Sequence, residues 1–176
     1  MSTPLFPRSE LVAIWDTSSV VHIRERVPRA SRADVLRRLL ALAGNQQVLL
    51  PHQVIEELER FRGASGRRDE LAAWARRCER VGASFHPRLE LVKGVLRAAP
   101  SLIDADAEFE EADPYVLALA LERAEIGDRV VVVTNDVRDR PTKMSLSTAC
   151  GLLGVASVPC LPHLARSEIY SDGRTA

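Results

Sequence analysis

Three short, uninterrupted apolar runs, at 11–15, 48–50 and 130–133, limit how this chain can fold. Each run is too short for a typical helix, and none alternates as a strand with one wet face does. Continuous apolar runs of this length are typical of strands buried on both faces of a parallel sheet. Because apolar residues recur at helical spacing between the runs, the chain is predicted to be α/β, with a short, mainly parallel central sheet.

Helical spacing and boundary residues place the remaining elements. Gly44-Asn45 ends one helix and Asp113-Pro114 begins another, because glycine suits a helix C-terminus and proline the first helical position. The expected helices lie near 35–43, 51–61, 71–81, 89–96, 113–124 and 145–153, and a last strand lies near 155–158. We expect a single domain over 1–170, with an added helical segment at about 63–101, and a loose tail at 171–176.

The charges cancel overall but are unevenly distributed along the chain. There are 24 Lys and Arg residues against 24 Asp and Glu residues. Residues 1–100 hold 17 basic and 11 acidic side chains, whereas residues 101–176 hold 7 and 13. Zero net charge argues against a dedicated nucleic-acid binder, which usually carries a basic excess. The asymmetry predicts an electrostatically divided surface.

Other features of the sequence indicate a cytoplasmic protein that does not enter a membrane. No run approaches the roughly 18–20 apolar residues of a membrane span, and the N-terminus lacks the basic and apolar stretches of a secretory signal. The three cysteines, Cys78, Cys150 and Cys160, are few and scattered. This pattern favours a reducing compartment over a disulfide framework.

Acidic side chains stand where the predicted strands end or the following helices begin. Asp16 and Asp136 follow the first and last apolar runs, and Asp113 opens a helix. Glu56 and Glu57 lie in the helix after the second run. Ligands of open parallel sheets bind beyond the carboxyl ends of the strands. Each acid also has an ordinary explanation: a helix N-cap for Asp16 and Asp113, a solvated helix face for Glu57, and a turn for Asp136.

Convergence of these carboxylates would indicate a metal ion. Helix capping does not require them to meet, and like charges brought together normally need a cation to stay ionised. Oxygen ligands select a hard ion, Mg²⁺ or Mn²⁺, over zinc. The histidines offer no zinc pattern, because His22, His52, His86 and His163 are scattered. A carboxylate-held ion of this kind suits the hydrolysis of phosphodiester bonds.

Four segments in order resemble the motifs of the PIN-domain family of metal-dependent ribonucleases. Val12–Ser19 looks like that family's opening strand, followed by its first acid and a hydroxyl residue. Leu49–Leu58 is similar to the motif V-P-x-x-V-x-x-E-L. Ala112–Ala120 looks like a helix of small and apolar residues opened by Asp, and Val130–Asp136 is similar to V-V-T-x-D. In the second segment the acid directly precedes Leu58, which selects Glu57 over Glu56.

The resemblance, over about residues 11–160, implies a three-layer α/β/α fold with four acids lining one cleft. The acids Asp16, Glu57, Asp113 and Asp136 would be both the catalytic residues and the ligands of one or two Mg²⁺ or Mn²⁺ ions. The implied activity is endonucleolytic cleavage of RNA.

The resemblance also bears on partners. Many small bacterial relatives are toxins of toxin–antitoxin pairs, often homodimeric and neutralised by a small antitoxin protein. This chain departs from the shortest toxins because it is longer, and its segment 143–155 is more like a less characterised bacterial PIN subgroup.

Further polar residues near these acids are candidates for orienting the carboxylates or for contacting RNA. The candidate donors are Thr17, Ser18, Thr134 and Asn135, which could equally cap the backbone. The candidate RNA contacts are Arg62, Arg67, Arg68, Arg138, Arg140 and Lys143, each with a solvated surface charge as the alternative.

Two other functions stay open on the sequence alone. One is a PIN-like module that binds RNA or protein without cutting, although all four acids are present. The other is a phosphatase or response-regulator-like domain, which also uses acids at strand ends. Ser18, however, stands where a D-x-D phosphatase has its second Asp. The sequence contains no glycine-rich nucleotide-binding motif.

Overall fold

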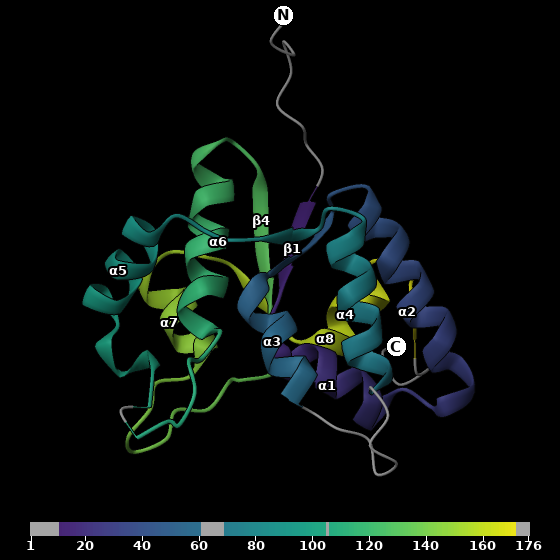
Figure 1. The fold of residues 1–176 in the computed structure, drawn as a ribbon, viewed down its shortest axis with the longest axis horizontal. Coiled ribbons are helices and arrows are strands. Elements are labelled where there is room, and N and C mark those ends of the chain that lie inside the picture. Colours follow the sequence, from purple (N-terminus) through teal and green to yellow (C-terminus); the bar gives the residue numbers. More distant parts are fainter. Residues whose placement is uncertain (1–10, 61–68, 105, 172–176) are drawn as a thin grey trace, which may run out of the picture.

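Five strands form one parallel sheet in the computed structural model, which describes residues 11–60, 69–104 and 106–171. They are β1 (Leu11–Trp15), β2 (Val48–Pro51), β3 (Ser84–Phe85), β4 (Arg129–Val133) and β5 (Ser157–Val158). Their order across the sheet is β3-β2-β1-β4-β5, so β1 lies at the centre (Figure 1). All neighbouring strands are parallel, which confirms the predicted α/β class and its parallel sheet.

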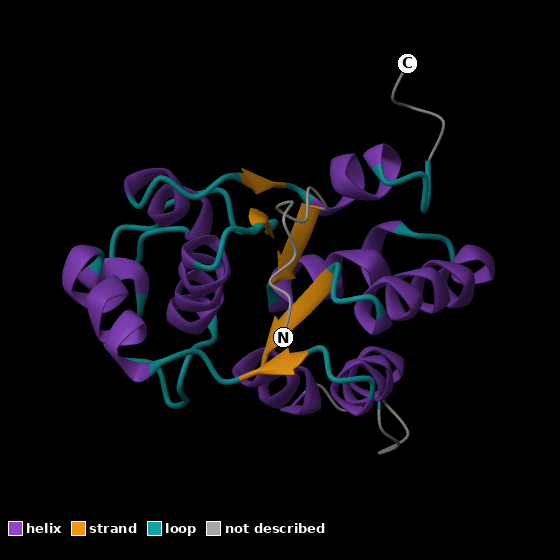
Figure 2. Cartoon of the chain, turned by 90° about the horizontal axis from the view of Figure 1, so that it is seen from above, coloured by secondary structure: helices purple, strands orange, loops and turns teal. Residues whose placement is uncertain are grey.

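Helices cover both faces of this sheet. They are α1 (Thr17–Arg26), α2 (Arg29–Gly44), α3 (His52–Arg60), α4 (Glu70–Arg80), α5 (Leu89–Ala98), α6 (Asp113–Glu125), α7 (Leu146–Leu152) and α8 (Cys160–Arg166), with a 3₁₀ turn, η1, at Pro100–Leu102. Helices α5, α6 and α7 lie on one side, and α1, α2, α4 and α8 lie on the other (Figures 1 and 2). The fold is therefore the expected three-layer α/β/α arrangement. Within the described ranges, no helix has the length and apolarity that crossing a bilayer requires.

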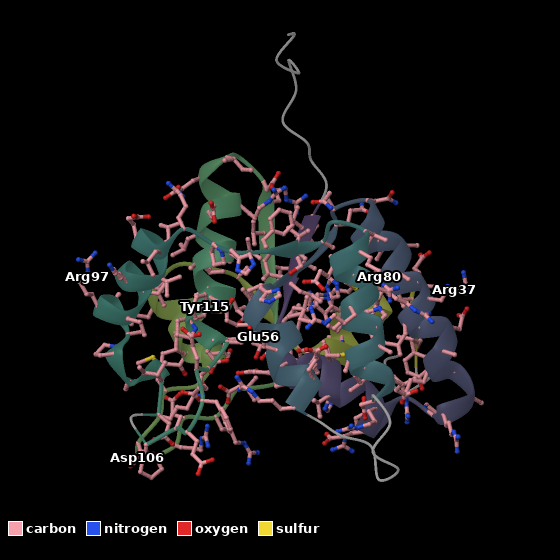
Figure 3. All side chains as sticks on the ribbon, viewed as in Figure 1. Arg37, Glu56, Arg80, Arg97, Asp106 and Tyr115 are labelled. Atoms are coloured by element: carbon pink, nitrogen blue, oxygen red, sulfur yellow. The ribbon has the colours of Figure 1, made fainter. Side chains whose placement is uncertain are left out.

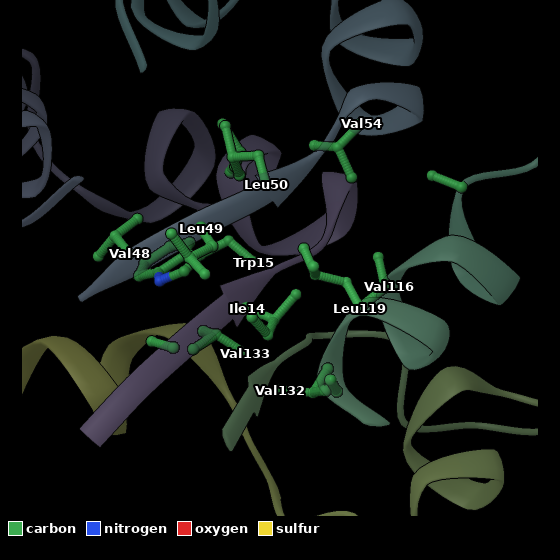
Figure 4. Packing of buried hydrophobic residues seen from close by; sticks show 14 of the residues in the cluster. Ile14, Trp15, Val48, Leu49, Leu50, Val54, Val116, Leu119, Val132 and Val133 are labelled. Carbon is green, nitrogen blue, oxygen red and sulfur yellow. The ribbon is translucent and has the colours of Figure 1, made fainter. Parts of the chain in front are cut away.

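The centre of the sheet explains why the strand sequences are continuously apolar. Along its whole length β1 pairs with β4, ending with Trp15 opposite Val133, and on its other side it pairs with β2. Residues Val12–Trp15 are all buried, because strands flank them and helices cover both faces. Figure 4 shows Ile14 of β1 and Leu119 of α6 among the side chains that fill this core. Burial of this apolar surface is the main force that holds the layers together.

Some local details differ from the sequence prediction. The expected helical segment at 63–101 contains α4 and α5, but also β3, which adds an edge strand to the sheet. A two-residue strand is too short to show any periodicity. Pro51 is the last residue of β2, and α3 begins one residue later. Helix α8 was not predicted, because its seven residues include a proline and little apolar spacing. Most of the predicted loose tail, 172–176, lies outside the described residues.

The three cysteines take no part in surface chemistry. Cys78, Cys150 and Cys160 are all free and buried. Burial raises the pKa of each thiol to about 12. The thiols are therefore protonated at neutral pH and are poor nucleophiles and metal ligands.

Helix α8 places a histidine against the core. His163 is 6% exposed, and its ring meets that of Trp15 edge-on, with 5.7 Å between the centroids. Burial, with a smaller contribution from the charge of Arg166, lowers the pKa of His163 from 6.5 to about 4. The folded protein keeps this imidazole neutral at pH values at which the unfolded chain protonates it.

Unfolding lets His163 take up a proton, so the contribution of this residue to the free energy of unfolding falls as the pH falls from 7 to 5. With a pKa of 6.5 unfolded and about 4 folded, this group alone changes the free energy of unfolding by about 2 kcal/mol over that interval. His163→Phe keeps a ring against Trp15 and removes the titration. In urea unfolding, the wild type should lose about 2 kcal/mol relative to the variant on going from pH 7 to pH 5. The same change of unfolding free energy in both proteins would contradict this explanation.

Candidate functional site

The four acids predicted from the sequence border one cavity at the carboxyl edge of the sheet. The cavity has a volume of about 460 Å³. Asp16 directly follows β1, and Asp136 lies just beyond β4. Glu57 comes from α3, the helix that follows β2, and Asp113 is the first residue of α6. The fold therefore brings the side chains of four separate elements together, as the order of the parallel strands requires.

Asp16 is the most tightly held of these carboxylates. It is 2% exposed, and its Oδ1 accepts a hydrogen bond of 2.8 Å from the backbone N–H of Ser19, which makes it the N-cap of α1. Its Oδ2 accepts from Ser18 Oγ and Thr134 Oγ1, both at 2.7 Å. Burial raises the pKa of Asp16, while the hydrogen bonds from Thr134, Ser18 and Ser19 oppose the shift. The capping explanation and the cavity location are therefore both correct for this residue.

Glu57 connects the starts of two helices. Its Oε1 accepts a hydrogen bond of 2.8 Å from the backbone N–H of Ala112, directly before α6, and its Oε2 accepts from the hydroxyl of Thr17 in α1. Glu56 instead lies 3.7 Å from His52 Nε2, with its side chain 46% exposed, and is not among the described residues that border the cavity. The choice of Glu57 over Glu56 therefore agrees with the geometry.

Asp113 shares the cavity with a lysine. It is the first helical residue of α6, while Ala112 takes the N-cap position, so the capping explanation does not hold here. Nζ of Lys143 lies 2.9 Å from Asp113 Oδ2. Burial raises the pKa of Asp113 to about 7; the charge of Lys143 opposes this, and the charges of Asp16 and Glu57 add to it. The carboxylates are therefore close enough to repel one another.

Asp136 lies where β4 leads into α7. Its Oδ2 accepts a hydrogen bond of 2.9 Å from the backbone N–H of Leu146, the first residue of α7. Its own N–H donates to Thr134 Oγ1 at 3.0 Å, and that hydroxyl in turn donates to Asp16. Thr134 therefore couples two of the acids across neighbouring strand ends.

The four predicted donor residues all belong to this network, in different ways. Ser18 and Thr134 donate to Asp16, and Thr17 donates to Glu57. Asn135 donates through its backbone N–H to Ser18 Oγ at 3.0 Å, so it reaches the carboxylate only indirectly.

Lys143 is a predicted RNA contact, but sequence reasoning did not foresee Glu111 or the pairing of Lys143 with acids of the site. Lys143 is 7% exposed, and its ammonium pairs with Glu111 as well as with Asp113. Carboxylates therefore engage this lysine in the structure, and its predicted contact with RNA stays a prediction. Glu111 also borders the cavity. The available signal was its place two residues before Asp113 at the end of an acidic stretch.

The candidate RNA-binding arginines have different locations. Arg140 borders the cavity, and Arg138 is exposed on the same loop. Arg62, Arg67 and Arg68 lie outside the described residues. Elsewhere on the surface, the arginines that Figure 3 labels lie on helices α2, α4 and α5, and none of them borders the cavity.

The chemistry of the cavity fits a hard cation. Among the described residues that border it, the oxygen-bearing side chains are carboxylates, hydroxyls and one amide, and there is no histidine or cysteine. Such donors suit Mg²⁺ or Mn²⁺. Within the described ranges, no three His, Cys, Asp or Glu side chains are arranged so that they could already hold a metal ion. The carboxylates are instead bound to protein donors and to Lys143, so a bound ion would have to draw them closer together.

Comparison with known proteins adds a family. A family model described as a domain of unknown function (DUF4411) matches residues 14–170, most of the chain. The chain belongs to the DUF4411 family. The matched part contains all the described residues that border the cavity, including the four acids. Searches of curated proteins and of solved structures gave no match.

The raised pKa of Asp113 predicts a cost to the stability of this DUF4411 domain. Between pH 3.8 and about 7 the folded state retains a proton that the unfolded chain has lost, so stability falls as the pH rises. Asp113→Asn removes this titration. In urea unfolding with a chelator present, the variant should gain stability relative to the wild type on going from pH 5 to pH 8, by about 3 kcal/mol.

Asp106→Asn, a change on an exposed side chain, provides the control and should show no such gain. If Asp113→Asn and the wild type differ in stability by the same amount at pH 5 and at pH 8, the raised pKa of Asp113 is contradicted.

Proposed function

We propose that this DUF4411 chain is a Mg²⁺- or Mn²⁺-dependent endoribonuclease. The observation that carries the proposal is the convergence of Asp16, Glu57, Asp113 and Asp136, from four elements, on one cavity at the carboxyl edge of the sheet. The resemblance of the same four segments to PIN-domain motifs supports the choice of reaction and of substrate.

The chain's own residues would hold and orient the reacting groups. Asp16 and Glu57 each have both oxygens bound by protein donors, which sets the direction of their carboxylates before any ligand arrives. When bound, a divalent cation supplies charge that neutralises a phosphate and assists the activation of water. Arg140 at the rim is placed to attract the RNA backbone through its charge.

The balanced charge of the chain is compatible with an RNA substrate. The acids around the cavity repel phosphate until cations neutralise them, so binding of RNA should depend on the divalent ion. A cytoplasmic location, where RNA is available, agrees with three free, buried cysteines. The toxin role, the antitoxin partner and the homodimer rest on the PIN resemblance alone.

The proposal predicts that Asp16→Asn and Asp136→Asn each abolish cleavage of RNA, by at least about 100-fold, because each removes a charge that the reaction requires. A labelled single-stranded RNA incubated with Mn²⁺, with Mg²⁺, or with EDTA gives the readout. Circular dichroism and thermal unfolding confirm that the variants remain folded.

Asp139→Asn is the matched control, since Asp139 lies three residues after Asp136 and does not border the cavity. Its contact with Ser145 can be kept by an amide oxygen. Wild-type rates in both site variants would contradict the proposal. RNA binding without cleavage by the wild type would instead favour a non-catalytic binding module.

A further inference from the structure

Lys143 brings a permanent positive charge into the carboxylate cavity. Its side chain is 7% exposed, its Nζ lies 2.9 Å from Asp113 Oδ2, and it also pairs with Glu111. Asp16 and Glu57 border the same cavity, and their charges act on Asp113. The ammonium therefore occupies space next to the carboxylates that a divalent cation would use.

The surrounding chain holds this ammonium in place from two sides. On its own loop, Lys143 and Arg140 exchange two backbone hydrogen bonds, at 2.8 and 3.2 Å. The next residue, Met144, donates its N–H to the carbonyl of Ser101 at 2.6 Å. On the opposite loop, Glu111 pairs with Lys143 through Oε1 and accepts the N–H of Asp104 through Oε2 at 2.6 Å. Lys143 is therefore a fixed feature of the cavity.

Few carboxylate oxygens in the cavity remain without a protein partner and could therefore bind two metal ions. Both oxygens of Asp16 and both of Glu57 already accept hydrogen bonds from the protein. One oxygen of Asp136 is bound by a backbone N–H, and one oxygen of Asp113 by Lys143. A pair of metal ions is commonly held about 4 Å apart and acts on both reacting oxygens. A second ion beside Asp113 would also be repelled by the ammonium.

From this geometry we infer that the cavity binds a single divalent ion and that Lys143 takes the place of a second one. The inference rests on the proposed function, because it concerns the same cation site. Lys143 acts here as a positioning residue that anchors Asp113 and Glu111. It also supplies a positive charge among the carboxylates that border the cavity.

The test is to count bound ions, which requires no RNA. In equilibrium dialysis and in electron paramagnetic resonance titrations with Mn²⁺ as the probe, the wild type should saturate at about one ion per chain. Lys143→Met removes the charge and keeps an apolar stem of similar length, and it should bind about two ions, which also couple magnetically. A purely structural role of Lys143 would not increase the number of bound ions.

Two variants control for folding and for charge. Lys143→Arg keeps the positive charge and should stay at about one ion. Lys93→Met makes the identical substitution at the chain's other lysine, which is exposed on α5, and should also leave the count unchanged.

Each outcome decides the inference. A wild type that binds two ions or none overturns it, and so does a folded Lys143→Met variant that stays at one. If Lys143→Met fails to fold, the wild-type count still decides. The proposed function fails in a different way: the ion counts would be as expected, but the wild type would not cleave RNA.

Discussion

The buried carboxylate of Asp16 organises the rest of the site. It stands at the end of the central strand. Burying an unpaired carboxylate there would cost about 3 kcal/mol of stability or more. Three donors compensate for this burial: the N–H of Ser19, the hydroxyl of Ser18, and the hydroxyl of Thr134 on the neighbouring strand end. Because β1 and β4 pair in register up to Trp15 and Val133, Asp16 and Thr134 are neighbours by necessity.

A second set of contacts ties the helices to this centre. Glu57 accepts from Thr17 at the start of α1 and from the backbone before α6, so three helices meet at one carboxylate. Asp136 fixes the first turn of α7 in the same way. The carboxylates of the candidate site therefore also bind backbone N–H groups at the starts of the helices around it. This double use explains why a capping explanation from the sequence and a functional one need not compete.

Local sequence patterns were sufficient to predict the fold and to select the four acids. They were insufficient to predict the ion pair between Lys143 and Glu111. A strand buried on both faces has a distinctive apolar run, and parallel strands place the residues that follow them at one edge. The pairing of Lys143 with Glu111 joins residues 32 positions apart on two loops, and nothing in either local sequence fixes where those loops meet. The strand β3 was missed for a related reason, since it exists only through pairing with β2.

The grouping of carboxylates is more than the fold itself requires. The pair Lys143–Glu111 would suffice to join the two loops, and α6 could begin without an acid, since Ala112 occupies its N-cap. Burial nevertheless raises the pKa of Asp113 to about 7, and the charges of Asp16 and Glu57 add to this shift. Such a residue lowers stability at neutral pH, and strongly perturbed groups in a cavity are more typical of functional sites than of structural ones. A cation bound among these acids would reverse the penalty, because it converts mutual repulsion into shared attraction.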